Sequence, residues 1–511
     1  MSFFEQMKNY QVDNDNVSIT ENGAIGYKTT GKKLVDLNFA VASLRKASEG
    51  DILAKYLDAF VENPELALRW LFFARDVRGG LGERRLFRVV INSFAHSNPN
   101  LVCKLVPLIA EYGRYDDLLV LLEDGVNDKV QKCALDYIKK QFEEDADNYS
   151  NGKSISLLVK WLPSINASNK ERNALGKRIA KHCELTERQY RKSLSTLRKY
   201  LDVTEVKMSA NKWDKIKYES VPSKANLNYK EAFLRHDEER RKEFLDKANK
   251  GEVKINSSVL YPHEIVSKYC SMGGWSTKLN EYDASLEALW KNLPDLVNSD
   301  KSVLVVGDGS GSMFMNTNPS PIYVSWALSI YFAERLKGAF ANKYIIFSSN
   351  PNMVKIRPEL SLRDKIAVTM KNTDCSNTNI EKTFDLILDT ALKNHCKQEE
   401  IPSTVLVISD MEFDSCTYRV NQKSLFKNFE DKFKANGYNM PKLVFWNVAS
   451  RTGTIPVKEN DAGVALVSGF STNSCKMVLS NKLDPLEILV EQLMNKRYDQ
   501  IGEVVKEVIG K

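Results

Sequence analysis

Two short apolar runs of this chain each end in an aspartate, and no other feature constrains the fold as strongly. The first run, residues 302–306, continues as Gly307-Asp308-Gly309-Ser310-Gly311-Ser312, and the second, residues 404–408, continues as Ser409-Asp410. Short β-branched runs bounded by glycine predict buried strands. Because open α/β sheets bind ligands at the carboxyl ends of parallel strands, we expect both aspartates at that edge of one sheet.

The side chains at these strand ends carry oxygen atoms of the kind that bind a hard divalent cation. Asp308, Ser310 and Ser312 form a D-x-S-x-S motif, and Asp410 ends the second run. Carboxylate and hydroxyl oxygens suit Mg2+ or Mn2+, and such an ion keeps an open position for water, an acidic side chain or a phosphate. In the alternative interpretation these residues only cap strands and helices. A phosphate-binding loop is a poorer interpretation, because the glycines lack the GK[ST] ending and the dinucleotide spacing.

The motif resembles the metal-ion-dependent adhesion site (MIDAS) of von Willebrand factor type A domains. In that family the two serines coordinate the ion directly, and a threonine and an aspartate from two further loops complete the site. The resemblance implies that Thr378 is the threonine and Asp410 the second aspartate. Thr373 and Ser376 are competitors for the threonine position.

The sequence predicts a helical part followed by an α/β part. Between residues 33 and 290, apolar residues recur at three- and four-residue spacing in short segments, which predicts a helical array without a strict repeat. From residue 302, predicted strands (342–349, 404–410, 443–449, 464–470) alternate with predicted helices (321–337, 380–393, 423–435, 485–496). This alternation is typical of a mostly parallel, Rossmann-like sheet. We expect a flexible N-terminal arm at 1–30, an all-α, HEAT-like repeat domain at 31–295 and an α/β von Willebrand A domain at 296–511.

The composition is that of a globular protein, with 43% hydrophobic and 27% charged residues over 511 positions. No run approaches the roughly 18 apolar residues of a membrane span, and the start lacks the pattern of a signal peptide. The eight cysteines contain no C-x-x-C pair, so we expect neither a zinc site nor a disulfide framework. A reducing, cytoplasmic location without membrane contact is the expectation that follows.

Basic residues gather in two stretches of the helical part, although the net charge of +7 is modest. Clustered lysines and arginines on helices suggest contacts with the phosphates of RNA. The candidate RNA-binding residues are Arg78, Arg84, Arg85, Lys177, Arg178, Lys181, Arg188, Arg191, Lys192, Arg198 and Lys199. For the first stretch, which also contains Arg88, the alternative is ion pairing with Asp76, Glu83, Asp116 and Asp117.

Two segments extend the resemblance to the whole chain. The segment R-G-G-L-G-E-R at 78–84, and the stretch from YRKSLSTLRKYLDVTE to VPSKA within 188–225, are similar to segments of the Ro autoantigen (TROVE-type) family. A less characterised cousin family of plants, fungi, bacteria and phages, with the same two-part layout, is a closer match. In the Ro family a basic surface and a cavity bind small structured RNAs and single-stranded RNA ends.

The resemblance therefore implies a non-enzymatic RNA-binding protein of ribonucleoprotein type, with a MIDAS-type site in its C-terminal part. The alternative is a metal-dependent protein–protein scaffold, in which the ion captures a carboxylate of an acidic partner. We expect no enzymatic activity, because the five histidines are dispersed and no nucleophile–base pair is evident.

Overall fold

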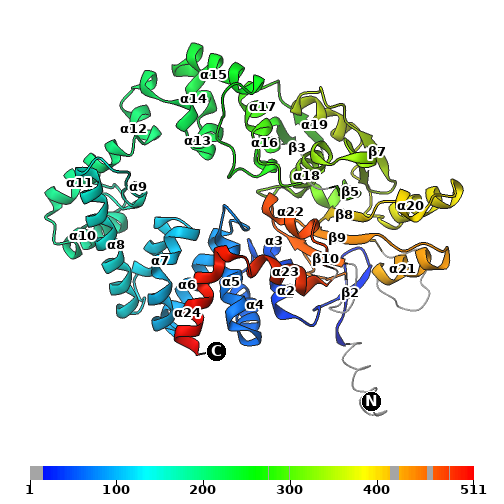
Figure 1. Ribbon diagram of the computed structural model, residues 1–511, viewed down its shortest axis with the longest axis horizontal. Coiled ribbons are helices and arrows are strands. Elements are labelled where there is room, and N and C mark those ends of the chain that lie inside the picture. The colour runs from blue at the N-terminus through cyan, green and yellow to red at the C-terminus, as the bar shows by residue number, and fades with distance from the viewer. Residues whose placement is uncertain are drawn as a thin grey trace. The chain divides into compact units, whose positions relative to one another are not determined.

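The computed structural model describes residues 15–273, 276–297, 300–414, 425–456, 464–482 and 484–510. The chain forms two compact units, each built from two separate segments (Figure 1). The α/β unit contains the chain up to Leu66 and Ser257–Asn495, and the helical unit contains Ala67–Asn256 and the residues from Lys496 on.

The α/β unit is built on a six-stranded sheet. Its strands follow the order β10-β9-β8-β5-β6-β7, and all neighbours are parallel except the edge pair β6–β7. The order reverses between β5 and β8, which is the switch point at which such sheets bind ligands. The strands are β5 (Val303–Asp308), β6 (Lys343–Phe347), β7 (Asn352–Lys355), β8 (Thr404–Ser409), β9 (Lys442–Asn447) and β10 (Val464–Ser468).

Helices cover both faces of this sheet. On one face, Val306 and Val407 pack with side chains of α2, α20 and α21 in a single apolar core. On the other face, β5 packs against α18, whose residues 321–333 are all buried. The helices of this unit are α2 (Lys33–Phe39), α3 (Val41–Leu44), α4 (Glu49–Glu62), α16 (Pro262–Tyr269), α17 (Ala284–Lys291), α18 (Pro321–Arg335), α19 (Leu362–Lys371), α20 (Glu381–Lys393), α21 (Leu425–Ala435), α22 (Cys475–Val478) and α23 (Pro485–Leu493).

A small hairpin near the N-terminus also belongs to the α/β unit. Strands β1 (Val17–Ile19) and β2 (Ile25–Tyr27) pair antiparallel. Tyr27 exchanges backbone hydrogen bonds of 2.8 Å with Ile455 in both directions, and Gly23 forms a bridge with Asp414. The expectation of a flexible arm over 1–30 is therefore wrong for residues 15–30. Its first fourteen residues lie outside the described chain.

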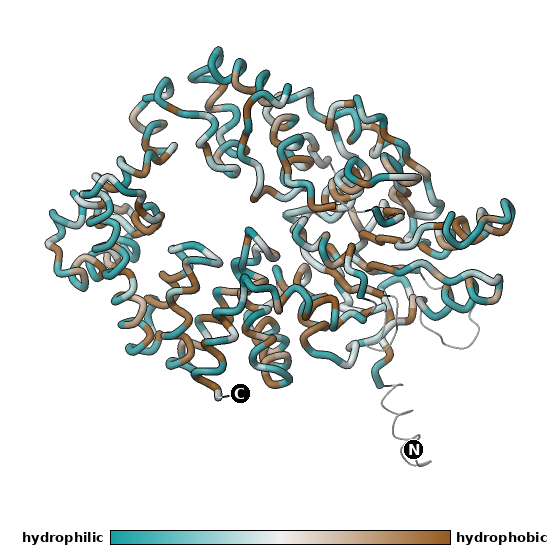
Figure 2. Tube along the Cα trace, in the orientation of Figure 1, coloured by the Kyte–Doolittle hydropathy of each residue, from teal (hydrophilic) through white to brown (hydrophobic). Residues whose placement is uncertain are grey.

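The helical unit consists of consecutive short helices packed against their neighbours. Brown and teal residues alternate along these helices in Figure 2, as they do in amphipathic helices. After α5 (Pro64–Arg75), which crosses into this unit, the helices are α6 (Arg84–Ser97), α7 (Pro99–Tyr112), α8 (Asp128–Ser150), α9 (Leu158–Trp161), α10 (Lys170–His182), α11 (Glu187–Tyr200), α12 (Thr204–Ser209), α13 (Ser223–Asn228), α14 (Lys230–His236), α15 (Glu238–Lys250) and α24 (Asp499–Ile509).

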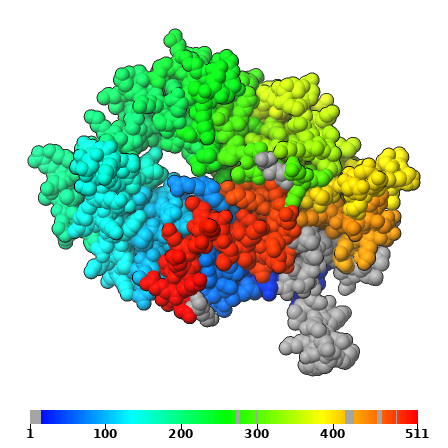
Figure 3. Space-filling view, in the orientation of Figure 1, coloured from blue at the N-terminus to red at the C-terminus, as the bar shows by residue number. Residues whose placement is uncertain are grey.

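The last residues of the chain return to this unit. Helix α24 packs on α7, and in Figure 3 its red segment lies against the light-blue helices. Tyr498 is buried against Phe73 and Tyr112, and Arg497 pairs with the fully buried Asp76. The division into units thus differs from the three consecutive domains expected from the sequence, because residues 15–66 pack with the sheet and residues from 496 pack with the helices.

The predicted fold class is confirmed: an array of short helices is combined with an α/β sheet that is mostly parallel. Two short strands, β3 (Cys270–Gly273) and β4 (Ser276–Leu279), form a hairpin within the range expected to be all helical. Cys103 of α7 and Cys133 of α8 form a disulfide with a Cα–Cα distance of 5.6 Å, which the cysteine spacing did not predict. In the described part of the chain, no helix has the length and hydropathy of a membrane span.

Candidate metal centre

The sheet brings the two aspartates of the sequence motif together. Strands β5 and β8 are parallel neighbours, with Gly307 opposite Ile408. Asp308 ends β5 and Asp410 follows β8, so both lie at the carboxyl edge beside the switch point. Both side chains are fully buried, with 0% exposure. The position is therefore a ligand-binding position of this fold class.

Short hydrogen bonds fix the loop that follows β5. The Asp308 carboxylate accepts the backbone N–H of Ser310 at 2.9 Å and the hydroxyl of Ser409 at 2.5 Å. The hydroxyls of Ser310 and Ser312 lie 3.2 Å apart. Glycine is favoured within the motif at position 309, since a Cβ on Gly309 would lie 2.7 Å from the Ile346 side chain. The loop thus directs two serine hydroxyls and one carboxylate to the same place.

Burial makes the charged forms of the two aspartates costly. Burial, with the neighbouring Asp410 as a further cause, raises the pKa of Asp308 to about 7. Burial also raises the pKa of Asp410, and the guanidinium of Arg451 opposes that increase. Two carboxylates in water-excluded surroundings are stabilised by a cation between them.

The three candidates for the threonine position differ in how firmly the described residues hold their side chains, and Thr378 has the longest side-chain hydrogen bond of the three, accepted from the Asn22 amide at 3.4 Å. The Thr373 hydroxyl donates to Thr369 O at 2.9 Å and accepts the Trp326 indole N–H at 3.2 Å. Ser376 Oγ donates to Asp374 at 2.7 Å. Thr378 is buried, and its loop joins the motif loop through a 3.0 Å bond from Gly311 N to Ser376 O.

An arginine that the sequence motifs did not indicate lies on the second aspartate. Arg451, in the loop after β9, donates from Nη1 to Asp410 Oδ2 at 2.8 Å. Its Nε donates to Glu21 Oε2 at 2.8 Å, and its Nη2 also pairs with Glu21. One guanidinium therefore bridges the proposed site and the turn between β1 and β2. No local motif distinguishes Arg451, because its partners lie 41 and 430 residues away.

The turn between β1 and β2 is anchored next to the site by Glu412. This carboxylate is fully buried and accepts the backbone N–H groups of Glu21 at 2.9 Å and Arg451 at 2.8 Å. The Asn22 amide donates to Glu412 O at 2.7 Å and to the Thr378 hydroxyl at 3.4 Å. Glu412 thus positions both Glu21 and Arg451 through main-chain contacts.

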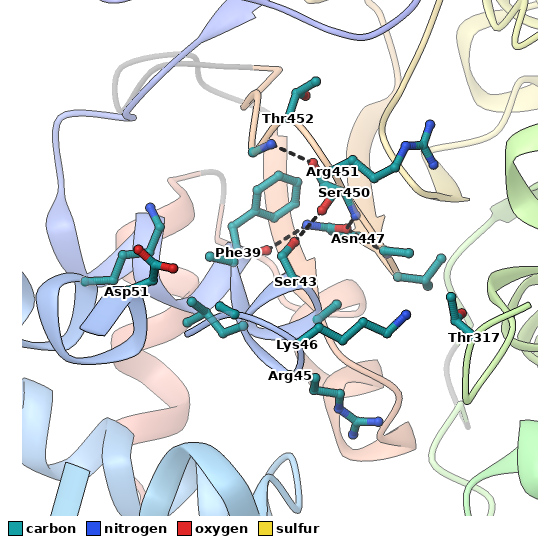
Figure 4. Close-up of a pocket in the computed structure, with 18 of the residues that line it drawn as sticks. Phe39, Ser43, Arg45, Lys46, Asp51, Thr317, Asn447, Ser450, Arg451 and Thr452 are labelled. Atoms are coloured by element: carbon teal, nitrogen blue, oxygen red, sulfur yellow. Dashed lines mark hydrogen bonds between the residues drawn. The ribbon is translucent and has the colours of Figure 1, made fainter. Parts of the chain in front are cut away.

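A cavity of about 660 Å³ lies beside this loop, and Arg451 contributes to its lining (Figure 4). Within it, Asn447 donates to Phe39 O at 2.9 Å, and the Ser43 hydroxyl donates to Ser450 O at 2.7 Å. Figure 4 shows these two bonds holding the loop after β9 against α2 and the start of α3. The loop that carries Arg451 is consequently supported on two sides.

The residues present fit a hard divalent cation in their chemistry. Among the described residues, no group of three or more His, Cys, Asp or Glu side chains is placed to hold a metal ion. The candidate set instead combines two carboxylates with three hydroxyls: Asp308, Asp410, Ser310, Ser312 and Thr378. Such oxygen donors suit Mg2+ or Mn2+ and not zinc. The positive charge of the Arg451 guanidinium, which pairs with Asp410, would oppose binding of a metal ion at this site.

Comparisons with known proteins match most of the chain. Residues 302–507 match a family described as a domain of unknown function, DUF7788, and residues 134–300 match another, DUF2828. The chain is 29% identical over 515 residues to the uncharacterized protein L728 of Acanthamoeba polyphaga mimivirus, covering 94% of this chain and 87% of that protein. The crystal structure of the RO (RSR) protein of Deinococcus radiodurans is similar with a TM-score of 0.35 and 13% identity, over 79% of this chain and 93% of that one.

Helices α10 and α11 carry most of the predicted RNA-binding residues. Their exposed side chains include eight lysines and arginines and two glutamates. Helix α11 buries Tyr190, Leu194 and Leu197, so its basic side chains occupy the solvent-facing side. The exposed candidates on these helices are Lys177, Lys181, Arg188, Arg191, Lys192 and Lys199.

Two candidates on these helices are used within the fold. Arg198 donates to the carbonyls of Val159 and Leu162 at 2.7 Å each, which satisfies the end of α9. Arg178 donates to Leu122 O at 3.1 Å and also contacts the Gln131 side chain. Both side chains are partly buried and engaged in these hydrogen bonds, so Arg178 and Arg198 are weaker candidates for RNA contacts than the exposed residues.

In the first basic stretch, residues 78–88, one arginine forms ion pairs and three arginines are exposed. Arg88 pairs with Asp116 and Asp117, as the intramolecular alternative expected. Asp76 is instead paired with Arg497. Arg78, Arg84 and Arg85 are exposed on the turn between α5 and α6 and on the first turn of α6.

Proposed function

We propose that this protein binds RNA through its helical unit and a divalent cation through its α/β unit, and that it acts by binding and not by catalysis. The observation that carries the RNA proposal is the excess of basic side chains on the solvent-facing sides of α10 and α11. Exposed lysines and arginines on neighbouring helices are the usual means of contacting a phosphate backbone.

The cation proposal rests on the convergence of oxygen atoms at the carboxyl edge of the sheet. Asp308 and Asp410 are fully buried, and among the described residues Arg451 is the cationic side chain that pairs with them. A bound Mg2+ or Mn2+ would supply two positive charges at this place. Ser310, Ser312 and Thr378 would complete the set of ligands without adding charge.

The RNA proposal is tested by binding of a small structured RNA at several salt concentrations, measured by fluorescence anisotropy. Each phosphate contact adds about 0.7 to 0.9 to the slope of log affinity against log salt. The double variant R191E/K192E is expected to lower the affinity and to reduce this slope by about 1.5 to 2. Slopes near zero, or unchanged affinity in the variant, contradict the proposal.

A matched control is the double variant K242E/K247E on α15. Both lysines are exposed and belong to i,i+4 pairs with glutamates on the same helix. It changes the net charge by the same amount, so a general electrostatic effect would weaken binding equally in both double variants. Only a local contact surface on α11 makes R191E/K192E the weaker binder.

The cation proposal is tested by titrating the metal-free protein with Mn2+ in a calorimeter. The variant D308N is expected to lose at least about tenfold in affinity, because it removes one of two charged ligands. The control D389N changes an exposed aspartate of α20 and is expected to bind like the wild type. Absence of Mn2+ binding to the wild type would refute the cation site without affecting the RNA proposal.

A further inference from the structure

One carboxylate of the proposed cation site, that of Asp410, is already paired with a positively charged side chain. Arg451 Nη1 lies 2.8 Å from Asp410 Oδ2, and this carboxylate is fully buried. Its other oxygen accepts the backbone N–H of Glu412 at 3.3 Å. A divalent cation bound to Asp410 would therefore lie next to the Arg451 guanidinium, and the two positive charges would repel each other.

The turn between β1 and β2 provides a second acceptor for the same guanidinium. Arg451 Nε donates to Glu21 Oε2 at 2.8 Å, and Nη2 pairs with the same carboxylate. Glu21 is kept there by its own N–H, which donates to Glu412 at 2.9 Å. Two of the three guanidinium nitrogens are therefore bound to Glu21 independently of Asp410.

The main chain around Arg451 does not depend on its side chain. The N–H groups of Arg451 and Thr452 donate to Glu412 at 2.8 and 2.9 Å. The guanidinium can thus leave Asp410 while the loop stays in place.

We propose that Arg451 and the divalent cation compete for Asp410, and that Glu21 retains the Arg451 guanidinium when the ion binds. This inference rests on the proposed cation site. In this arrangement Arg451 neutralises Asp410 in the absence of the ion, and the N-terminal hairpin sets the affinity for the ion.

The test is Mn2+ titration of the full-length protein by calorimetry, comparing the wild type with R451Q and E21Q. R451Q is expected to bind about tenfold more tightly, equivalent to about 1.4 kcal/mol, because the competing charge is gone. E21Q is expected to bind about threefold more weakly, because Arg451 then has Asp410 as its remaining carboxylate partner. R451K keeps the charge and is expected to stay close to the wild type.

A matched control pair lies at the opposite edge of the sheet. Arg357 and Glu359 follow β7, which runs antiparallel to β6, and they form an exposed ion pair at 3.7 Å. R357Q and E359Q repeat the two charge changes away from the site and are expected to leave Mn2+ affinity unchanged. Thermal melting of each variant shows whether the fold is retained.

The outcomes separate this inference from the proposal on which it depends. If the wild type binds Mn2+ but R451Q binds no more tightly, the competition is refuted and the cation site stands. If R451Q and E21Q change the affinity in the same direction, the retaining role of Glu21 is refuted. If neither the wild type nor R451Q binds Mn2+, the cation site fails and the competition fails with it.

Discussion

Replacing Arg497 by methionine should destabilise the helical unit, because it leaves a buried carboxylate without its cation. Asp76 is fully buried and pairs with Arg497 through Nε and through Nη2, the latter at 3.0 Å. Breaking a buried ion pair from the cationic side costs about 3 to 5 kcal/mol. Asp76 keeps its bonds to Tyr498 Oη at 3.1 Å and to Arg78 N at 3.0 Å. Because the Arg497 side chain is 31% exposed and Asp76 keeps two donors, we expect a cost just below this range, about 2 to 3 kcal/mol.

The measurement is urea unfolding, combined with hydrogen exchange of the peptides that contain α7 and α24. R497M should lower the unfolding free energy and speed exchange in both helices, because α24 packs on α7 and the substituted residue lies just before α24. D76N should cost less, because an asparagine can still accept from Arg497 and no charge is left buried. In the double variant the cost should be smaller than the sum, with a coupling of about 1 kcal/mol or more.

The neighbouring Lys496 supplies the control. It is exposed, so K496M removes the same charge from the adjacent position and should change stability by no more than about 0.5 kcal/mol. If R497M and K496M were equally stable, or if D76N cost more than R497M, the assignment of the buried carboxylate as the source of the effect would be refuted.

Three further predictions concern the backbone, a lysine and the disulfide. G80A should cost about 3 kcal/mol, because the new Cβ would lie 1.8 Å from Phe73 O. Burial lowers the pKa of Lys442 to about 8, so stability should rise as the pH increases from 8 to about 10.5, where the unfolded chain holds the extra proton; K442M should abolish this rise. Reduction of the Cys103–Cys133 bond, which spans 30 residues, should cost up to about 3 to 4 kcal/mol.

Urea unfolding checks all three, each with its own reference. G50A, in the first turn of α4, places its Cβ no closer than 3.7 Å to another atom and should be neutral or slightly stabilising. Unchanged stability of G80A would contradict the close approach. A flat profile of the wild type between pH 8 and 10 would contradict the lowered pKa of Lys442. Equal stability with and without reductant, or a reductant effect that persists in C103S/C133S, would contradict the disulfide.

The central strands were predictable because their burial leaves a continuous signal in the sequence. Strands β5 and β8 are buried at every position, so they are short apolar runs bounded by polar residues. Strand β7 was missed, since it lies at the sheet edge and Val354 is its one buried residue. A strand with one buried side chain has neither an apolar run nor an alternating pattern.

The contacts that close the proposed site could not be predicted, because they join distant segments. Strands β1 and β2 have three residues each, and their turn contacts Glu412 across 391 residues. The pairing of α24 with α7 likewise depends on Arg497 and Tyr498, which resemble any polar start of a helix until Asp76 is placed beside them. The local sequence pattern predicts helices and strands, whereas these side-chain pairs form only once the fold has brought distant helices and strands together.

The same reasoning limits what the D-x-S-x-S motif says about the ion. Glu412 is buried without a cation because backbone N–H groups and hydroxyls satisfy its oxygens. Asp308 is held by neutral donors as well, whereas Asp410 has a guanidinium. At an effective dielectric constant of about 20, a carboxylate and a guanidinium about 4 Å apart attract each other by about 4 kcal/mol. Arg451 therefore compensates the charge of Asp410, one of the two buried aspartates of the site. The burial of two carboxyl groups side by side, and not the motif itself, is the physical reason to expect a divalent cation at this edge of the sheet.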